Sequence, residues 1–173
     1  MNHILIYGVP DVGKTTITKC MHAKTGIYLI EGDFIRSPYP ATKYAWRKFG
    51  SLTKENAIRG LLYVRDYMHK DVDKVLDKHK EVILEAVFID PVKYHNRAKM
   101  NLLVCSDEAT HRKQFFKKRA ETDESRENFL AIRMIQEFLL NEAKKLKVKV
   151  IQNDSNPDAV AQQIISEIST RSL

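Results

Sequence analysis

The chain alternates short, wholly apolar runs with longer stretches in which apolar residues recur every three or four positions. The short runs are typical of buried strands, and the longer pattern is that of amphipathic helices. The runs that predict strands are residues 4–7, 27–30, 82–84, 100–105 and 148–152. Short strands that alternate with helices predict an α/β fold in three layers, α/β/α, with a parallel sheet covered on both faces.

Helical periodicity covers residues 14–23, 107–119, 126–145 and 158–169, together with a long helix that begins after Ser51 or Thr53 and continues to 79. Between the second predicted strand and this long helix, the stretch 34–50 is irregular and rich in aromatic residues, and prolines interrupt it. We expect its aromatic side chains either to line a ligand site or to pack a surface loop.

Length and composition are those of one globular domain. The 173 residues are 43% hydrophobic and 29% charged, which suits a single core, and no linker or repeat divides them. No apolar run approaches the ~18–20 residues of a membrane-spanning helix, and the first apolar run is too short for a secretory signal. Two cysteines cannot form a disulfide scaffold. We therefore expect a cytoplasmic protein with no membrane partner.

The charge balance and the histidines limit the kinds of partner. Lysine and arginine exceed aspartate and glutamate by 29 to 22, a net charge of +7. This excess favours anionic partners, either phosphorylated small molecules or nucleic acid. The six histidines are dispersed without metal-ligand spacing, so we expect no structural zinc.

One motif carries the strongest chemical signal. Residues 8–15 read Gly-Val-Pro-Asp-Val-Gly-Lys-Thr and match G-x-x-x-x-G-K-[ST] at every fixed position. The match stands directly after a predicted strand and at the start of a predicted helix, the context that a phosphate-binding loop requires. We expect the nucleotide to contact Gly8, Val9, Pro10, Asp11, Val12, Gly13, Lys14, Thr15 and Thr16.

Each fixed residue of the motif has a physical role. Gly8 and Gly13 permit backbone angles and close approaches that a Cβ atom would obstruct. The loop N–H groups and the helix dipole attract phosphate oxygens. Lys14 is expected to bind the β- and γ-phosphates, and the Thr15 hydroxyl to ligate Mg²⁺. The acid at Asp11 is unusual inside such a loop. The cofactors we expect are ATP and Mg²⁺.

Other phosphate-loop chemistries lack their usual signals here. The Asn-Lys-x-Asp element that reads guanine in GTPases is missing after the last predicted strand, where the chain reads Gln152-Asn153-Asp154. Motor and AAA-type ATPases usually show two acids after an aliphatic strand, whereas residues 82–86 offer Glu85 alone. Neither a GTP switch nor a motor is therefore favoured.

Charged residues follow the second and third predicted strands. Asp33 and Arg36 lie three apart after the second strand, so a helical turn would place them on one face. Asp33 is a candidate for the base that accepts a proton or for a ligand of the metal's water, and Arg36 for the clamp on an anionic acceptor. Glu85 could order the acceptor or the metal's water shell. The alternatives are a helix cap at Asp33, a surface residue at Arg36 and a backbone-bonded acid at Glu85.

A basic segment follows the fourth predicted strand. Arg112, Arg119 and Arg126 recur at intervals of seven and would share one face if their helix were continuous. Arginines on a lid can close over the γ-phosphate, stabilise charge in the transition state and exclude water. The alternative is a solvated charged face.

These features together resemble the small-molecule kinases of the phosphate-loop fold, including nucleoside monophosphate, shikimate and gluconate kinases. The shared features are residues 8–15, the Asp33-x-x-Arg36 element, the acid Glu85 and the basic lid. The resemblance implies a five-stranded sheet of order 2-3-1-4-5, ATP with Mg²⁺, and phosphoryl transfer to a small hydroxyl acceptor. It also implies one domain over residues 1–173, with an acceptor-binding insertion at about 34–79 and a lid at about 111–126.

A narrower resemblance, to archaeal 2-phosphoglycerate kinase, rests on residues 112–153, above all 129–139 and 148–153. It implies a phosphate contact at Arg133. The chain departs from the family pattern in carrying Glu85-Ala86 where the family has Glu-Gly.

The sequence thus favours an ATP-dependent phosphotransferase acting on a small anionic acceptor, either 2-phosphoglycerate-like or a nucleoside or nucleotide. The catalytic candidates are Lys14, Asp33, Arg112, Arg119 and Arg126; the acceptor candidates are Asp33, Arg36, Glu85 and Arg133; and the metal candidates are Thr15, Asp33 and Glu85. A nucleic-acid-associated or regulatory ATP-binding protein, or a slow ATPase, is the alternative.

Overall fold

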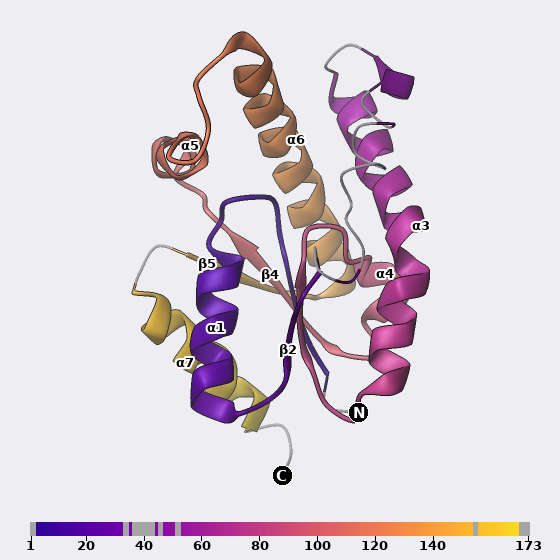
Figure 1. The fold of residues 1–173 in the computed structure, drawn as a ribbon, viewed down its shortest axis with the longest axis vertical. Helices are drawn as coiled ribbons and strands as arrows, with labels where there is room; N and C mark the ends of the chain where they lie inside the picture. The colour runs from indigo at the N-terminus through magenta and orange to yellow at the C-terminus, as the bar shows by residue number, and fades with distance from the viewer. Residues whose placement is uncertain are drawn as a thin grey trace.

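The computed structural model describes residues 3–32, 35, 44, 47–50, 53–153 and 156–169. The elements of these ranges are shown in Figure 1. In chain order they are β1 (Ile4–Tyr7), α1 (Lys14–Thr25), β2 (Leu29–Glu31), α3 (Lys54–Lys78), β3 (Ile83–Ala86), α4 (Pro91–Tyr94), β4 (Lys99–Val104), α5 (Glu108–Phe116), α6 (Asp123–Leu146), β5 (Lys149–Gln152) and α7 (Pro157–Ser169).

The five strands form one parallel sheet of order β2-β3-β1-β4-β5, which confirms the predicted fold class and strand order. Strand β1 is central, and its residue Ile4 is in register with Ile83 of β3 and Lys99 of β4. Because every strand runs the same way, the carboxyl ends of all five lie at one edge of the sheet. In open α/β sheets this edge is where ligands bind.

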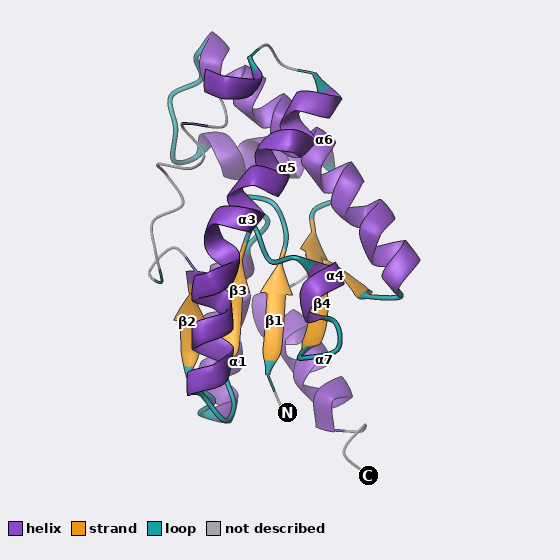
Figure 2. Ribbon diagram, turned by 90° about the vertical axis from the view of Figure 1, so that its right-hand side faces the viewer, coloured by secondary structure: helices purple, strands orange, loops and turns teal. Residues whose placement is uncertain are grey.

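Helices cover the sheet on both faces. Helix α1 packs against α7 on one face, and α3 packs against α6 on the other, where α4 also contacts α6. Figure 2 shows α5 beyond the carboxyl edge of the sheet, the edge to which the strand arrows point. The start of α6 also extends past this edge. The helices around the carboxyl edge therefore frame the region where a ligand is expected.

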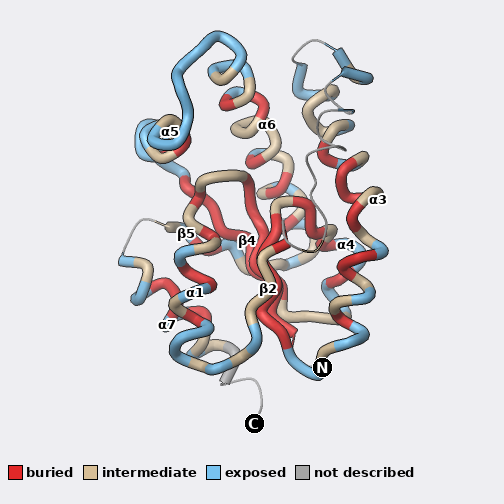
Figure 3. Tube along the Cα trace, viewed as in Figure 1, coloured by how far each residue is buried: buried red, intermediate tan, exposed pale blue. Residues whose placement is uncertain are grey.

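The core follows the central strands. All four residues of β1 are buried, as are all four of β3, and Figure 3 shows this buried band through the middle of the molecule. Helices pack on both faces of these strands, so the strand sequences are apolar runs rather than alternating apolar and polar residues. This double burial is why short runs were sufficient to predict the sheet.

Caps decide where the two long helices begin. The Thr53 side chain accepts a hydrogen bond from the Asn56 N–H, so Thr53 is the cap of the two candidates that the sequence offered. Helix α6 begins at a capping box in which Thr122 and Ser125 bond each other's backbone N–H groups. This box starts the helix at Asp123, three residues earlier than the periodicity predicted, because it satisfies two otherwise orphaned N–H groups.

One short helix was missed by the periodicity argument. Helix α4 is a single turn, too short to show a 3.6-residue pattern. Asp90 caps it by accepting a hydrogen bond from the Val92 N–H at 2.9 Å, and Pro91 occupies its first position. Aspartate at the cap and proline at the first helical position are together typical of the start of a helix.

A buried ion pair holds α3 on α6. Arg65 donates to both carboxylate oxygens of Glu142, at 3.0 and 2.8 Å, and their side chains are 3% and 15% exposed. Nearer the start of α3, Lys54 binds Glu137 at 2.8 Å on the surface. The two ion pairs hold α3 against α6. Helix α3 forms the end of the predicted acceptor insertion, and α6 continues from the end of the predicted lid.

Candidate active site

The loop between β1 and α1 has the backbone of a phosphate cradle. A Cβ atom on Gly8 would lie 2.2 Å from the Leu103 carbonyl oxygen, and one on Gly13 would lie 2.3 Å from Nδ2 of Asn153. Gly13 also has a left-handed φ of 90° at the start of α1. Both glycines are therefore required by close contacts, as the motif predicted.

Asn153, directly after β5, supports this loop. Its side chain Nδ2 donates to the Val12 carbonyl oxygen at 2.8 Å, and its backbone N–H donates to the Val104 carbonyl oxygen at 2.9 Å. Sequence reasoning considered this region for a guanine-reading motif and for the resemblance to 2-phosphoglycerate kinase, and missed the contact. It joins residues 141 positions apart, which no local pattern reveals.

Lys14 lies over the loop that it follows. The lysine is 7% exposed, and its Nζ atom donates to the Val9 carbonyl oxygen at 3.0 Å. Val9 and Val12 are completely buried and anchor the loop in the core. The lysine charge is therefore held against a rigid loop at the carboxyl edge of the sheet.

This geometry suits a polyphosphate group. The N-cap residue of α1 is Gly13, which has no side chain to cap the first turn. The N–H groups at the start of a helix and the positive end of its dipole attract anions. Together with Lys14, they supply both partial and full positive charge to a phosphate.

The metal candidates fit Mg²⁺ rather than a dedicated protein cage. Among the described residues, no group of three or more His, Cys, Asp or Glu side chains could hold a metal. Mg²⁺ at nucleotide sites usually takes one or two protein ligands, with phosphates and waters supplying the rest. Thr15 in the first turn of α1 is partly exposed, and Glu85 on β3 is buried at 6% exposure. Both residue types fit that role.

The exit of β2 lies against the end of β3. A Cβ atom on Gly32 would be 2.5 Å from the Ala86 Cβ atom and 2.8 Å from the Glu85 carbonyl oxygen. Glu31 is in register with Glu85 and binds Lys19 of α1 at 3.1 Å. Asp33 and Arg36 lie outside the described residues, so their roles stay predictions from the sequence.

The predicted lid is not one continuous helix. Helix α5 ends at Phe116 and α6 begins at Asp123, so the seven-residue spacing of the arginines does not place them on a common face. Arg112 lies on α5, Arg119 in the connection and Arg126 on α6. A common face required one continuous helix, whereas the capping box starts α6 as a separate helix.

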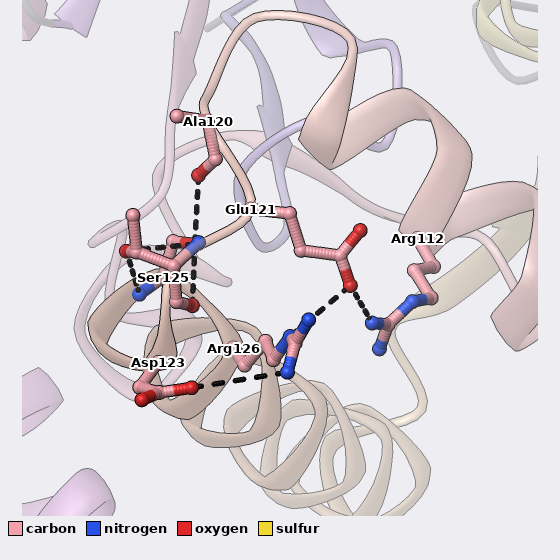
Figure 4. A network of polar contacts seen from close by, with 7 residues as sticks. Arg112, Ala120, Glu121, Asp123, Ser125 and Arg126 are labelled. Carbon is pink, nitrogen blue, oxygen red and sulfur yellow. Dashed lines mark hydrogen bonds and ion pairs between the residues drawn. The ribbon is translucent and has the colours of Figure 1, made fainter.

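Two of the three arginines pair within the lid, as Figure 4 shows. Arg112 and Arg126 bind the same carboxylate oxygen of Glu121, Arg126 through Nε at 3.3 Å. Arg126 also lies 3.8 Å from Asp123. The third arginine, Arg119, instead binds Asp11 of the loop at 2.5 Å. The structure therefore divides a set that the sequence treated as equivalent.

A buried histidine links the loop to α5 and α6. His111 is completely buried; its Nε2 lies 2.9 Å from the Pro10 carbonyl oxygen, and its Nδ1 lies 3.3 Å from Nη1 of Arg133. The arginine can only donate and the carbonyl can only accept, so these contacts assign the proton to Nε2. Sequence reasoning counted His111 among the dispersed histidines and at the start of the predicted lid, and did not find this contact.

Arg133 holds the exit of β4. Its Nη1 and Nη2 atoms donate to the carbonyl oxygens of Cys105 and Ser106 at 2.9 and 3.2 Å. Arg133 contacts His111, and His111 in turn contacts the Pro10 carbonyl oxygen of the loop. The phosphate contact predicted for Arg133 stays a prediction.

An open hollow of about 500 Å³ lies along the outer side of α1. Its lining starts at Thr15 and Thr16 and continues past Cys20 to Asp158 at the start of α7. The exposed Thr16 thus lies between the loop and a space beside it, and its predicted contact with the nucleotide stays a prediction.

Burial of His111 makes stability depend on pH. Burial, the largest cause, lowers the pKa of His111 from its ordinary 6.5, and the charges of Arg133 and Lys14 lower it further, although the Pro10 carbonyl and Asp11 raise it. The folded chain then binds fewer protons than the unfolded chain, so this contribution to the free energy of unfolding falls as pH drops below about 6.5.

We therefore expect His111→Asn to show a smaller loss of unfolding free energy between pH about 7.5 and about 5 than the unsubstituted chain, as measured by urea titration. The loss that persists is assigned to groups such as His3, whose pKa is also lowered by burial. An equal loss in both proteins would contradict the assignment.

Solved structures of P-loop kinases match nearly the whole chain. Shikimate kinase from Acinetobacter baumannii, in complex with shikimate, matches with a TM-score of 0.65 at 13% identity, over 99% of this chain and 94% of that one. A gluconokinase from Sinorhizobium meliloti 1021 gives 0.59 at 12% identity, over 98% and 92%. Deoxyadenosine kinase from M. mycoides, with bound dATP, gives 0.59 at 14% identity, over 96% and 98%.

No family model and no curated protein matches the sequence. At these identities the structural matches establish the fold, which is the α/β/α fold of the P-loop kinases. The narrower resemblance to 2-phosphoglycerate kinase is not shown by them and stays a prediction. In the described part of the chain, no helix combines the length and apolar character needed to cross a membrane.

Proposed function

We propose that the protein is an ATP- and Mg²⁺-dependent phosphotransferase that moves the γ-phosphoryl group to a small anionic acceptor. The observation that carries this proposal is Lys14 held over the Gly8–Gly13 loop at 3.0 Å from the Val9 carbonyl oxygen, with Arg119 of the predicted lid bound to the same loop. A loop built to receive phosphate and a lid arginine beside it are what phosphoryl transfer requires.

The structural neighbours support a kinase but do not choose its acceptor. Their names refer to gluconate, shikimate and deoxyadenosine, three chemically different small molecules. The net charge of +7 and the acceptor candidate Arg36 favour an anion. The 2-phosphoglycerate-like acids and the nucleosides or nucleotides are therefore the acceptors to test first, and the cytoplasm is the proposed location.

In this proposal the nucleotide end of the site works by position and charge. The loop 8–13 and the first turn of α1 bind the phosphates, and Lys14 stabilises negative charge on the β- and γ-phosphates. Thr15, with Glu85 or Asp33, would hold the Mg²⁺, which neutralises phosphate charge. Arg112, Arg119 and Arg126 close the lid at about 111–126 and exclude water, which would otherwise hydrolyse ATP.

The acceptor end is formed by the insertion at about 34–79 within a single domain, residues 1–173. Arg36, Glu85 and Arg133 are the groups proposed to orient the acceptor, with Asp33 beside its hydroxyl. The acceptor oxygen forms a bond to the γ-phosphorus as the bond from that phosphorus to the β–γ bridging oxygen breaks. Asp33 takes the hydroxyl proton, and ADP leaves with the bridging oxygen.

A panel of acceptors tests the proposal. ADP release from MgATP is measured with phosphorylated three-carbon acids, nucleosides and nucleoside monophosphates, with Lys14→Ala as the inactive reference. We expect one class to raise ADP release at least about tenfold over the rate without acceptor, with one phosphorylated product per ADP. Salt-sensitive binding of RNA or DNA with no acceptor turned over would instead support the nucleic-acid alternative.

The same assay separates the two roles open to Asp33. If Asp33 is the base, Asp33→Asn should bind MgATP as the unsubstituted chain does and lose transfer by about 100-fold or more. An equal loss of MgATP binding and transfer would show that Asp33 acts on the metal instead.

A further inference from the structure

Asp11 is an acid inside a loop that binds anions in the proposed function. Its φ is 59°, a left-handed conformation that favours glycine and is tolerated by aspartate. Its side chain is only 10% exposed. A carboxylate so placed repels a phosphate, and low exposure weakens the screening of that repulsion by solvent. Such a residue needs a compensating cation.

Arg119 supplies that cation with a defined geometry. Its Nη1 atom donates to Oδ2 of Asp11 at 2.5 Å and to the Phe115 carbonyl oxygen at 3.0 Å. The guanidinium carbon also lies 4.2 Å from the centre of the Phe115 ring. Lys118 adds a second, more distant charge at 3.9 Å from the carboxylate. These contacts hold the arginine at the loop while its side chain stays 39% exposed.

The contact belongs to a docked surface, because α5 and the residues after it meet the loop at more than one point. His111, Phe115 and Arg119 lie four residues apart; His111 bonds the Pro10 carbonyl oxygen and Phe115 is buried. Arg112 and Arg126 pair with Glu121 instead (Figure 4). In the described part of the lid, Arg119 is thus the arginine that an ion pair holds at the phosphate loop.

We propose that Asp11 is a positioning residue that docks Arg119 at the edge of the phosphate site before the nucleotide binds, so that Arg119 contacts the γ-phosphate and discriminates ATP from ADP. This inference rests on the proposed function. The five N–H donors of a guanidinium can serve a carboxylate and a phosphate together. ADP offers no γ-phosphate, so the docked arginine adds affinity for ATP only.

The test is calorimetric titration of MgATP and MgADP into the unsubstituted chain, Asp11→Asn, Arg119→Ala and the double variant. We expect Arg119→Ala to reduce the ratio of ATP affinity to ADP affinity about tenfold, the scale of one charge-assisted hydrogen bond. Asp11→Asn should reduce the same ratio severalfold while binding MgADP at least as tightly, because a repulsive charge is gone. The double variant should match Arg119→Ala, since Asp11 acts through the arginine.

Two further variants control for effects on folding and for the loss of an ion pair elsewhere. Asp11→Gly removes the carboxylate in a residue suited to the φ of 59°, so it should keep or raise the melting temperature and lower the ratio as Asp11→Asn does. The matched control is Asp77→Asn, which breaks the Arg97–Asp77 pair at the far end of α3 and should leave the ratio unchanged.

Three outcomes overturn the inference. An unchanged ratio in Asp11→Asn and Asp11→Gly shows that Asp11 does not position Arg119. A raised ratio shows that Asp11 competes with the nucleotide for the arginine. If the unsubstituted chain binds MgATP, and Lys14→Ala does not, either result rejects this inference and leaves the proposed function intact. If the unsubstituted chain binds neither nucleotide, both fail together.

Discussion

Lys14→Ala is expected to lower ATP turnover by about 100-fold or more, the cost of losing one preorganised charge donor at a transition state. The lysine Nζ atom lies at the loop, 3.0 Å from the Val9 carbonyl oxygen, and its charge is the proposed partner of the β- and γ-phosphates. Initial rates of ADP release, with the best acceptor of the panel, measure the effect.

The matched control for this prediction is Lys78→Ala. Lys78 is an exposed lysine in the last turn of α3, remote from the carboxyl edge of the sheet, and its removal should leave the rate within about twofold. Lys78→Ala should melt close to the unsubstituted chain, since surface changes rarely cost much stability; the melting temperature of Lys14→Ala, a buried position, is measured beside its rate. Near-normal turnover in Lys14→Ala would defeat the kinase assignment.

Arg65→Ala is expected to lower the free energy of unfolding by up to about 3–5 kcal/mol, because it leaves the largely buried Glu142 carboxylate without its partner. Arg65 and Glu142 are 3% and 15% exposed and meet through two hydrogen bonds. The loss should appear as a lower midpoint in urea unfolding with an unchanged slope.

Arg59→Ala on the same helix is the control. The Arg59–Glu55 pair is exposed at 57% and 71%, and pairs of this kind contribute about 0.3–0.5 kcal/mol. Replacing both buried partners together, as Arg65→Met with Glu142→Leu, should recover most of the loss, since an apolar pair of similar volume needs no compensating charge. A cost for Arg65→Ala no larger than that of Arg59→Ala would contradict this reading of the α3–α6 contact.

Local signals predicted the sheet and the glycine-bearing turn between β1 and α1. The central strands β1 and β3 are buried throughout, so four-residue apolar runs were sufficient there, and the glycines and Lys14 of the loop stand at fixed spacing. The cap at Thr53 was likewise among the two candidates offered. These features depend on residues that are near one another in the chain.

Features that depend on distant residues were not predicted. The bond from His111 to Pro10 spans 101 positions and that from Asn153 to Val12 spans 141, and neither has a sequence pattern. The lid arginines were expected to share one face if their helix were continuous, but the capping box at Thr122 and Ser125 starts a separate helix. The pairing of Arg119 with Asp11 could be found only once the topology brought α5 over the loop.

The central claim is that the loop 8–15 binds the phosphates of a nucleotide, and calorimetric titration of MgATP into the unsubstituted chain tests it most directly. We expect saturable heat at one nucleotide per chain, abolished in Lys14→Ala. We also expect loss of binding in Gly13→Ala, whose Cβ atom would collide with Asn153. Absence of heat from MgATP and MgGTP with the folded chain, or equal binding by Lys14→Ala, would contradict the claim.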